Sequence, residues 1–513
     1  ATPIPTATPI PTATPIPTAT PIPTATPTPS PQPTTAATPQ FSLANGFYTQ
    51  TQSVAITSPT AGVTIRYTTD ASQPTQSHGT VYTGPISIAS STILQAIAYS
   101  STFSSSAVAS AIYSFPFGPE DIESSSVPCP AYTAIGDINL DGKNDVVVGN
   151  VYPCNSSGTS ASVISIMLGN STGFFTHNAA NDVLVTYSPY NQIFPEGIVL
   201  ADIDGNGKLD ILFGAWGTNA LGILLNTTTA GSPTVSFSTS QPTYISNLGS
   251  GPRFIDVGDV DGDGQADVVV GISNGDNIVS VFLGNGNGTF NNTAINFTVG
   301  QSGASPTTVK LVDINTDGKA DIIVPVNGSS STGAISVLIN TTTTVGSPAF
   351  TTYTHFVADT TNNNGWSLTA AFGDLNNDSK PDIVVNNQSS GQVAVLLNTT
   401  AQASTSPSFT TASFYSTDAG PEMVAIGDAD GDGDLDIFTI NDSTGATCTV
   451  SLLLGSGNGY FSSPTHYAVG AGTNSIYFGR GISLGFIGYG SGVDVVTPNP
   501  ADHSISVLLN TVF

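Results

Sequence analysis

The sequence predicts an all-β protein in which a seven-bladed β-propeller and a small immunoglobulin-like β-sandwich follow an N-terminal polyproline II stalk. Three observations favour this fold class. The 513 residues include 53 Gly and 35 Pro, so turns are frequent. Only 8% of the residues are charged, far below the roughly one quarter of an average protein. Short β-branched segments recur along the chain, and from residue 116 onward they follow a repeat of about 58 residues.

The charge balance excludes two classes of function. The chain has 8 Lys and Arg against 35 Asp and Glu, which gives a formal charge of −27. Nucleic-acid binding requires clustered basic residues, and so does docking to an anionic membrane. No apolar run reaches the 18 residues or so of a transmembrane helix. We therefore expect no nucleic-acid partner and no membrane insertion, and the turn-rich composition is typical of an extracellular, secreted or cell-surface protein.

Residues 1–39 form the predicted stalk, which begins with four copies of ATPIPT. So much Pro excludes a helix or a central strand and favours polyproline II, with three residues per turn. Six residues then make two turns, so that Ala1, Ile4 and their later counterparts share one apolar edge while Thr occupies the others. One interpretation is a semi-rigid spacer. The other is an O-glycosylated stalk whose apolar edge packs against other copies of the protein, giving a homo-oligomer or filament.

Residues 40–115 contain short alternating segments separated by turns, which predicts an antiparallel β-sandwich. The segments are 54–57, 63–68, 86–88, 93–99 and 107–113. The runs TIRYTTDASQPT, VYTGPISI and ILQAIAYS resemble the C-terminal β-sandwich of chitobiases and hexosaminidases. That resemblance implies an accessory domain without catalytic residues.

Residues 116–513 consist of seven repeat units, each expected to form four strands. A short apolar strand leads to an Asp-rich nonapeptide, a β-branched strand such as DVVVG and a strand ending in LLN or LLG. The nonapeptides start at Asp137, Asp202, Asp259, Asp313, Asp374 and Asp428, and a degenerate copy starts at Phe486. A closed ring of such units is preferred to a linear solenoid because four-stranded units of this length match propeller blades. The seventh unit lacks an outer strand, which the segment between Phe115 and Pro128 could supply.

The six nonapeptides read DINLDGKND, DIDGNGKLD, DVDGDGQAD, DINTDGKAD, DLNNDSKPD and DADGDGDLD. Positions 1, 3, 5 and 9 carry Asp or Asn, and position 6 is Gly except for Ser379. Side-chain oxygens at 1, 3 and 5, a backbone carbonyl at 7 and a carboxylate at 9 can surround one hard cation. This donor set predicts Ca²⁺, about six ions in all, with Asp at position 9 as the strong and bidentate ligand. In the seventh unit Phe486, Gly488 and Gly490 replace the ligands, so that only Asp494 remains and no metal is expected.

The candidate metal ligands are the residues at positions 1, 3, 5, 7 and 9 of each loop. They are Asp137, Asn139, Asp141, Lys143, Asp145, Asp202, Asp204, Asn206, Lys208, Asp210, Asp259, Asp261, Asp263, Gln265, Asp267, Asp313, Asn315, Asp317, Lys319, Asp321, Asp374, Asn376, Asp378, Lys380, Asp382, Asp428, Asp430, Asp432, Asp434 and Asp436. The pattern resembles the FG-GAP and VCBS-type repeats, the family that includes the integrin alpha propeller. The resemblance implies a seven-bladed propeller with calcium in the hairpin between the first two strands of a blade.

No catalytic constellation emerges from the sequence, so no enzymatic activity and no catalytic residue are predicted. Glu196 and Glu422 lie just before the first strands of blades two and six, which are not adjacent, whereas a glycosidase needs two nearby carboxylates. His177, His355 and His466 fall in outer-strand regions of different blades. Trp216 and Trp366 are candidates for sugar stacking, although packing is the simpler interpretation.

The cysteines and the Asn-x-Ser/Thr tripeptides, called sequons below, give two further expectations. Cys129 and Cys154 flank the first acidic hairpin and are predicted to form a disulfide, leaving Cys448 as a thiol. The alternative is that Cys129 and Cys154 are two small buried thiols. Twelve Asn-x-Ser/Thr tripeptides occur, including those at Asn226, Asn340 and Asn398, against about nine expected by chance, so they indicate glycosylation only weakly.

Together these features predict a non-catalytic extracellular structural or adhesive protein, a subunit of a surface appendage or filament. Its calcium-stabilised propeller would be displayed on a glycosylated Pro/Thr stalk. The candidate partners are other copies of itself through the stalk and cell-surface glycans or proteins. The alternative is a carbohydrate-binding, lectin-like protein or a secreted polysaccharide-degrading protein.

Overall fold

The computed structural model describes most of the chain after the Pro/Thr repeats. The described residues are 35–48, 50–115, 117, 121–123, 129–150, 162–170, 175–186, 193–246, 248–249, 251–273, 277–300, 305–327, 334–358, 369–442, 448–470, 481–488 and 492–512. The predictions for residues 1–34 of the stalk, for Cys154 and for Trp366 lie outside these residues. The described part is all-β, as predicted, and contains no α-helix. No described helix has the length and apolar character needed to cross a membrane.

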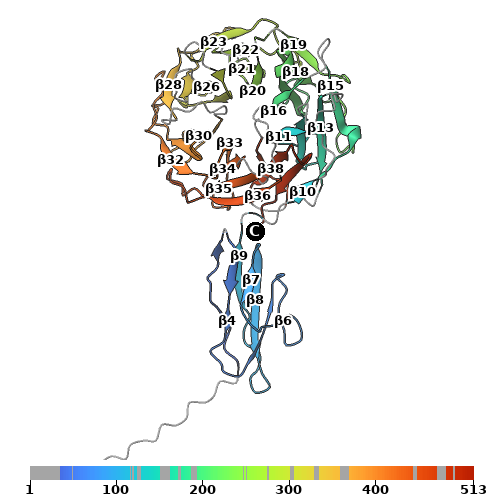
Figure 1. The fold of residues 1–513 in the computed structure, drawn as a ribbon, viewed down its shortest axis with the longest axis vertical. Coiled ribbons are helices and arrows are strands. Elements are labelled where there is room, and N and C mark those ends of the chain that lie inside the picture. Colours follow the sequence, from blue (N-terminus) through green and yellow to red (C-terminus); the bar gives the residue numbers. More distant parts are fainter. Residues whose placement is uncertain are drawn as a thin grey trace, which may run out of the picture.

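A β-sandwich with one five-stranded sheet and two small pairs occupies the region before residue 115 (Figure 1). Its strands are β1 (Gln40–Phe41), β2 (Gly46–Phe47), β3 (Gln52–Val54), β4 (Ile56–Thr57), β5 (Thr64–Thr68), β6 (Thr80–Val81), β7 (Ile86–Ile88), β8 (Thr92–Tyr99) and β9 (Ala109–Ser114). The predicted segments all contain strands, but one pairing differs, because β2 runs parallel to β9. The buried side chains of Val54, Leu94 and Tyr113 belong to the core of this sandwich.

Seven further sheets lie around a ring, and each corresponds to one repeat unit of the sequence (Figure 1). Sheet 1 contains β11 (Pro130–Gly136), β12 (Asp145–Asn150), β13 (Ser162–Gly169), β14 (Phe175–Thr176) and β15 (Asp182–Val185). Sheet 2 contains β16 (Pro195–Ala201), β17 (Asp210–Ala215), β18 (Ala220–Leu224) and β19 (Thr243–Ser246). Sheet 3 contains β20 (Pro252–Gly258), β21 (Asp267–Ile272), β22 (Ile278–Phe282) and β23 (Ile295–Thr298). Sheets 1 and 2 also carry the short 3-10 turns η1 (Ala179–Asn181) and η2 (Trp216–Thr218).

The remaining four sheets repeat this arrangement. Sheet 4 contains β24 (Ser305–Pro306), β25 (Lys310–Val312), β26 (Asp321–Asn327), β27 (Ala334–Leu338) and β28 (Thr354–Val357). Sheet 5 contains β29 (Ala370–Gly373), β30 (Asp382–Asn387), β31 (Gln392–Leu396) and β32 (Ser413–Ser416). Sheet 6 contains β33 (Pro421–Gly427), β34 (Asp436–Asn441), β35 (Cys448–Leu453) and β36 (Thr465–Val469). Sheet 7 contains β10 (Asp121–Glu123), β37 (Ser483–Gly485), β38 (Asp494–Asn499) and β39 (Ser504–Leu508).

Sheet 7 is assembled from two distant parts of the chain. The strand β10 pairs antiparallel with β39, with Asp121 opposite Val507 and Glu123 opposite Ile505. This confirms that the segment between Phe115 and Pro128 supplies the strand that the seventh unit lacks. The side chain of Phe117 is buried in the core shared with sheet 6. Nearby, the Thr511 hydroxyl hydrogen-bonds the Ser91 hydroxyl of the sandwich at 3.0 Å, so the junction also joins the two domains.

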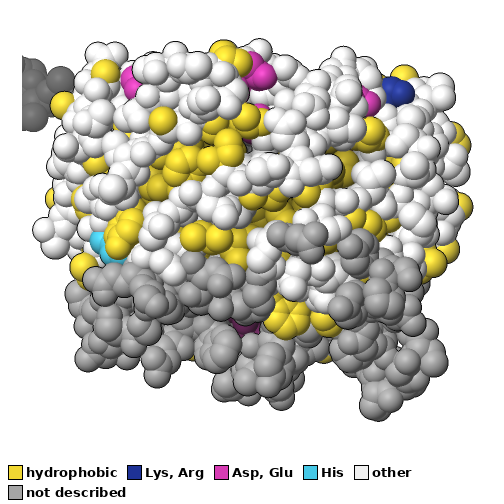
Figure 2. All heavy atoms as spheres, turned by 90° about the horizontal axis from the view of Figure 1, so that it is seen from above, with side chains coloured by type: hydrophobic (Ala, Val, Ile, Leu, Met, Phe, Trp, Pro, Cys, Tyr) yellow, Lys and Arg dark blue, Asp and Glu magenta, His cyan; other side chains and the backbone are white. Residues whose placement is uncertain are grey.

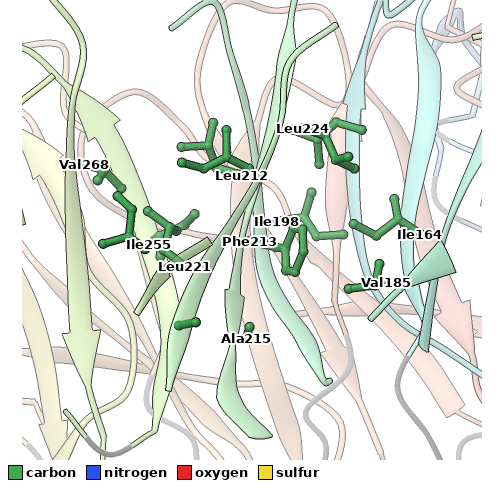
Figure 3. Close-up of a cluster of buried hydrophobic side chains, with 14 of the residues drawn as sticks. Ile164, Val185, Ile198, Leu212, Phe213, Ala215, Leu221, Leu224, Ile255 and Val268 are labelled. Atoms are coloured by element: carbon green, nitrogen blue, oxygen red, sulfur yellow. The ribbon is translucent and has the colours of Figure 1, made fainter. Parts of the chain in front are cut away.

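The second and third strands of each sheet are buried on both faces, which explains their continuous β-branched sequences. In sheet 2, successive residues of β17 face opposite neighbours. Figure 3 shows Phe213 directed toward Ile164 of sheet 1, while Leu221 of β18 lies toward Ile255 and Val268 of sheet 3. Each sheet therefore contributes apolar side chains to two interfaces, and no sheet could bury its own core alone.

The two cysteines in the described part of the ring behave differently. Cys129, just before β11, is disulfide-bonded. Its predicted partner, Cys154, lies outside the described residues. Cys448 is a buried thiol, as predicted, and its sulfur lies 3.5 Å from Oδ1 of Asp442.

Candidate metal centres

Each of the six acidic nonapeptides connects the first and second strands of its sheet. Position 9 is in every case the first residue of the second strand, as for Asp267 at the start of β21. In sheet 4 the two short segments β24 and β25 together take the place of the first strand, and Asp321 begins β26. Figure 2 shows acidic side chains along one rim of the ring, with a basic side chain close to one of them. The loops therefore occupy the hairpin position that the sequence resemblance implies.

Two residues of every loop adopt the left-handed backbone conformation. Position 6 has a positive φ throughout, and Ser379 reaches the same region at 65° although it is not Gly. Position 4 also has a positive φ in all six loops, which the sequence analysis missed. The position-4 residues are Leu140, Gly205, Gly262, Thr316, Asn377 and Gly431. Only three of the six are Gly, so the glycine pattern gave an incomplete signal.

The side chains at positions 1, 3 and 5 organise the loop through backbone N–H groups. In the fourth loop, Oδ1 of Asp313 accepts from the N–H of Asp317 at 3.0 Å, and its Oδ2 accepts from Gly318 at 2.8 Å. The amide oxygen of Asn315 accepts from Asp317 at 3.1 Å, and Asp317 accepts from Lys319 at 3.0 Å. These bonds turn the oxygens of three side chains toward the centre of one short loop.

The carboxylate at position 9 is buried and is held at both oxygens. Oδ2 of Asp321 accepts from Ile314 N at 2.9 Å, and its Oδ1 accepts from Asn340 N at the end of the third strand at 2.7 Å. Equivalent bonds occur in the other five loops. Each oxygen of Asp321 keeps a second lone pair, so a ligand role is compatible with this geometry, but position 9 also fastens the hairpin to the third strand.

Burial raises the pKa of the position-9 carboxyls, and the backbone hydrogen bonds only partly oppose this effect. The pKa rises to about 6 for Asp145, Asp210, Asp267 and Asp382 and to about 7 for Asp321 and Asp436. In the sixth loop, burial and the neighbouring charge of Asp432 raise the pKa of Asp430 to about 6. A divalent cation would relieve both the burial cost and the mutual repulsion.

In three loops the carboxylates alone come close enough to share one ion. Their ligand atoms all lie within 4.8 Å of one another in the sets Asp202, Asp204 and Asp210; Asp259, Asp261 and Asp263; and Asp428, Asp430 and Asp436. Oxygens bound to one calcium at about 2.4 Å are at most about 5 Å apart, so this spacing fits a single ion. In the other three loops position 3 is Asn, whose amide oxygen would complete the set. The donors are all oxygens, which fits Ca²⁺ better than a softer metal.

If only the backbone carbonyl served at position 7, the basic side chains there would be expected to point away from the loops. Not all of them do. The ammonium group of Lys143 contacts Oδ2 of Asp141 at 2.9 Å, and that of Lys319 donates to the carbonyl of Thr342 at 2.7 Å. Burial of Asp141 raises its pKa, but the hydrogen bonds from Lys143 outweigh this and lower it overall. Lys143 therefore competes with a cation for one ligand of the first loop.

Neighbouring sheets are joined at these loops by buried Asn side chains, a feature that sequence reasoning missed. The amide nitrogen of Asn340 in sheet 4 donates to the position-2 carbonyl of the third loop, Val260, at 2.9 Å. Asn226, Asn398 and Asn510 make the same contact to Ile138, Ile314 and Ala429. In sheets 3 and 6 the backbone N–H of Gly288 and Gly459 replaces the Asn side chain, bonding Ile203 and Leu375. The sequence did offer a signal for this contact, namely the Asn that recurs at the end of the LLN strands.

A second group of ionisable residues lies on the innermost strands. Glu196 is only 1% exposed and accepts from Nε of Arg253 at 2.6 Å. Tyr132 of sheet 1 is buried beside them and interacts electrostatically with both Glu196 and Arg253. The register of β11, β16 and β20 shifts at this point of each strand. Glu196 therefore belongs to a buried ion pair, and it lies within β16 rather than before it, as Glu422 lies within β33.

The three histidines and Trp216, which the sequence singled out, do not gather into a site within the described residues. His177 pairs with Asp182 at 2.8 Å, His355 lies 3.3 Å from the carbonyl of Val299, and His466 bonds Ser451 at 2.9 Å. Trp216 is 37% exposed in η2 and packs edge-on against Phe194 at 5.6 Å between ring centroids.

Two families match parts of the chain. Residues 43–110 match the chitobiase/beta-hexosaminidase C-terminal domain, and residues 137–213, 259–324 and 374–439 match the FG-GAP-like repeat. These matches confirm the resemblance to the chitobiase and hexosaminidase domain and to the FG-GAP repeats. No curated protein matches the chain significantly.

Among solved structures, the chain resembles an Agrocybe aegerita lectin that recognises non-reducing terminal N-acetylglucosamine. The identity is 21%, with 67% of this chain and 81% of that chain covered and a TM-score of 0.43. It also resembles the exotype rhamnogalacturonan lyase YesX at 12% identity, with 91% and 89% covered and a TM-score of 0.38. With TM-scores this low, neither likeness supports a conclusion about function.

Proposed function

We propose that the protein is a non-catalytic extracellular scaffold whose seven sheets form a closed, calcium-stabilised β-propeller. One observation carries this proposal: six loops present converging oxygen ligands in a common geometry, and each is fastened by hydrogen bonds to the following sheet. Filling six loops with divalent ions would add twelve positive charges and reduce the formal charge from −27 to −15. Calcium would then stabilise individual hairpins and the interfaces between sheets together.

The calcium sites can be tested by thermal unfolding with and without a chelator. A ligand that binds only the folded state stabilises it by RT ln(1 + [L]/Kd), about 2.7 kcal/mol per site at a hundredfold excess over Kd. Chelation should therefore lower the melting temperature, and adding Ca²⁺ back should restore it, whereas Mg²⁺ at the same concentration should restore much less. An identical melting temperature in calcium and in chelator would refute the proposal.

The structural or adhesive role extends this proposal to the Pro/Thr stalk. The apolar edge of the repeated hexapeptide supports association between copies of the chain, with the propellers displayed outward. Electron microscopy of the native protein, compared with a chain lacking residues 1–39, tests this role. We expect filaments or oligomers only from the full chain, and the same assembly from both would exclude the stalk as the assembly element. Binding on a glycan array together with turnover of a polysaccharide would instead favour the carbohydrate-directed alternative.

A further inference from the structure

The structure separates the Asn-x-Thr tripeptides of the chain into two environments. Asn226, Asn340 and Asn398 are at most 2% exposed. In each case the amide nitrogen donates to two backbone carbonyls, as Asn340 does to Val260 at 2.9 Å and to Ala320 at 3.0 Å. A sugar attached to this nitrogen would break both bonds and would have no space between the sheets. These three tripeptides therefore serve the contacts between sheets.

Asn287 has the opposite environment. It is exposed in the turn between β22 and β23, on the same side of its sheet as the acidic loops. Its amide oxygen accepts from the backbone N–H of Thr289 at 3.1 Å and from the Thr289 hydroxyl at 2.7 Å. No acceptor for its amide nitrogen is found within the described part of the chain, so that nitrogen faces solvent.

The turn around Asn287 is held in this shape by its neighbours. The side chain of Asn285 donates to the Thr289 hydroxyl at 2.9 Å, and the Asn285 backbone N–H donates to the Thr289 carbonyl at 2.9 Å. The backbone N–H of Gly288 donates to the Ile203 carbonyl of the second acidic loop at 3.1 Å. The acceptor tripeptide is thus fixed on the surface, with the hydroxyl of its third residue already bonded to the amide of its first.

We propose that Asn287 carries an N-linked glycan. This inference rests on the proposed extracellular location, because the tripeptide must pass through a compartment that contains an oligosaccharyltransferase and its lipid-linked sugar donor. In the reaction, the Asn287 amide nitrogen forms a bond to C1 of the first sugar. The bond from C1 to the diphosphate oxygen breaks, the lipid diphosphate leaves, and the nitrogen gives up one proton. The Thr289 hydroxyl, by donating to the amide oxygen, favours attack through nitrogen.

Four other sequons begin at exposed residues of the described chain. The sequon at Asn170 is not compared, because its Thr172 lies outside the described residues, and the other three are poorer acceptors than Asn287. The amide nitrogen of Asn377 donates to Oδ1 of Asp434 at 2.9 Å and to the Gly457 carbonyl at 3.3 Å. Asn296 is on the outer strand β23, where its amide oxygen accepts from the Ser280 hydroxyl at 2.8 Å instead of from its own Thr. Asn291 is exposed, but no bond joins its amide to Thr293 within the described residues. Asn287 alone among them combines exposure, an unengaged nitrogen and the internal hydroxyl contact.

Peptide mapping of the protein purified from the cells that make it tests the proposal. Treatment with a peptide N-glycosidase in ¹⁸O-water converts each glycosylated Asn into labelled Asp. We expect label at Asn287 and none at Asn226, Asn340 or Asn398. Asn285 is a matched control, because it also precedes Gly and undergoes the same spontaneous deamidation, but it is not part of a sequon.

Label at Asn287 no higher than at Asn285 would overturn the proposal, and so would label at the three buried positions. As a second measurement, Thr289→Ala should abolish the label while Thr289→Ser retains it. The calcium dependence of the melting temperature of the same preparation is independent of these results. If no glycan is found at Asn287 but calcium still stabilises the protein, this inference alone is refuted. If calcium does not stabilise the protein, the proposed scaffold is refuted.

Discussion

Replacing Asn340 by Ala should destabilise the ring through the contact between sheets 3 and 4. The wild-type side chain makes three buried hydrogen bonds, donating to Val260 and Ala320 and accepting from the N–H of Thr342 at 2.9 Å. In the Asn340→Ala variant, the carbonyls of Val260 and Ala320 and the N–H of Thr342 stay buried but lose this hydrogen-bond partner. Each such loss costs about 1 kcal/mol, so we expect the free energy of unfolding to fall by about 3 kcal/mol.

The expected change is large enough to measure by calorimetry. Unfolding entropy is about 2.1 cal/mol/K per residue, or about 0.8 kcal/mol/K for the roughly 400 residues of the ring. A loss of 3 kcal/mol then lowers the melting temperature by about 4 °C. The loss should persist in chelator, because none of the three bonds involves a cation.

The matched control is Asn291→Ala. Asn291 also begins a sequon, but it is exposed and none of the described hydrogen bonds involves its side chain, so its replacement should shift the melting temperature by well under 1 °C. A shift for Asn340→Ala no larger than the control, in calcium and in chelator, would show that the amide contacts contribute nothing to stability.

Three further predictions concern the acidic loops. Thr316→Gly should raise the free energy of unfolding by about 1 kcal/mol in a urea titration, because Thr316 has a φ of 53° that Gly adopts without strain. A stability unchanged or lowered would contradict this explanation. The raised pKa values of Asp267, about 6, and Asp321, about 7, mean that the folded state binds more protons than the unfolded state. The stability of the calcium-free protein should therefore fall as the pH rises from about 4 through these values. The stabilisation gained by adding calcium should increase over the same range. Melting curves between pH 4 and 8 that show the reverse would exclude this account. Finally, Asp317→Asn should weaken calcium binding in calorimetric titration while changing stability in chelator little. Asp321→Asn should destabilise the protein even in chelator. Equal effects of the two variants in chelator would contradict the separate roles given to positions 5 and 9.

Much of the fold could be predicted because each sheet repeats the same local pattern. The β-branched run that became β21 is buried on both faces, and continuous apolar runs bounded by turns indicate such strands. The missing outer strand of sheet 7 was predicted by counting strands in each unit, since an open edge would remain otherwise. The parallel pairing of β2 with β9 went against the expected antiparallel sandwich, because two short segments far apart in sequence carry no signal of their relative direction.

The contacts between sheets could not be predicted in the same way. Asn340 and Asn287 begin the same kind of tripeptide, and the sequence alone does not distinguish a buried amide from an exposed one. Arg253 and Glu196 are 57 residues apart and meet only because neighbouring sheets place their innermost strands side by side. Position 4 of the acidic loops went unnoticed because left-handed backbone there is tolerated by Leu140 and Thr316 as well as by Gly.

Sheet 7 separates the structural and cation-binding roles of the acidic loops. Its hairpin has Phe486 and Gly488 at positions 1 and 3, yet Asp494 is retained at position 9. Its carboxylate accepts from Ile487 N at 2.5 Å, Gly488 N at 2.8 Å and Asn510 N at 2.5 Å. The bonds from Ile487 and Asn510 have counterparts in all six other sheets. A position-9 carboxylate is therefore needed to join hairpin and third strand whether or not a cation is present. Sheet 7 keeps its hairpin without acids at positions 1, 3 and 5, and the proposed cation would account for the recurrence of Asp and Asn there in the other six sheets.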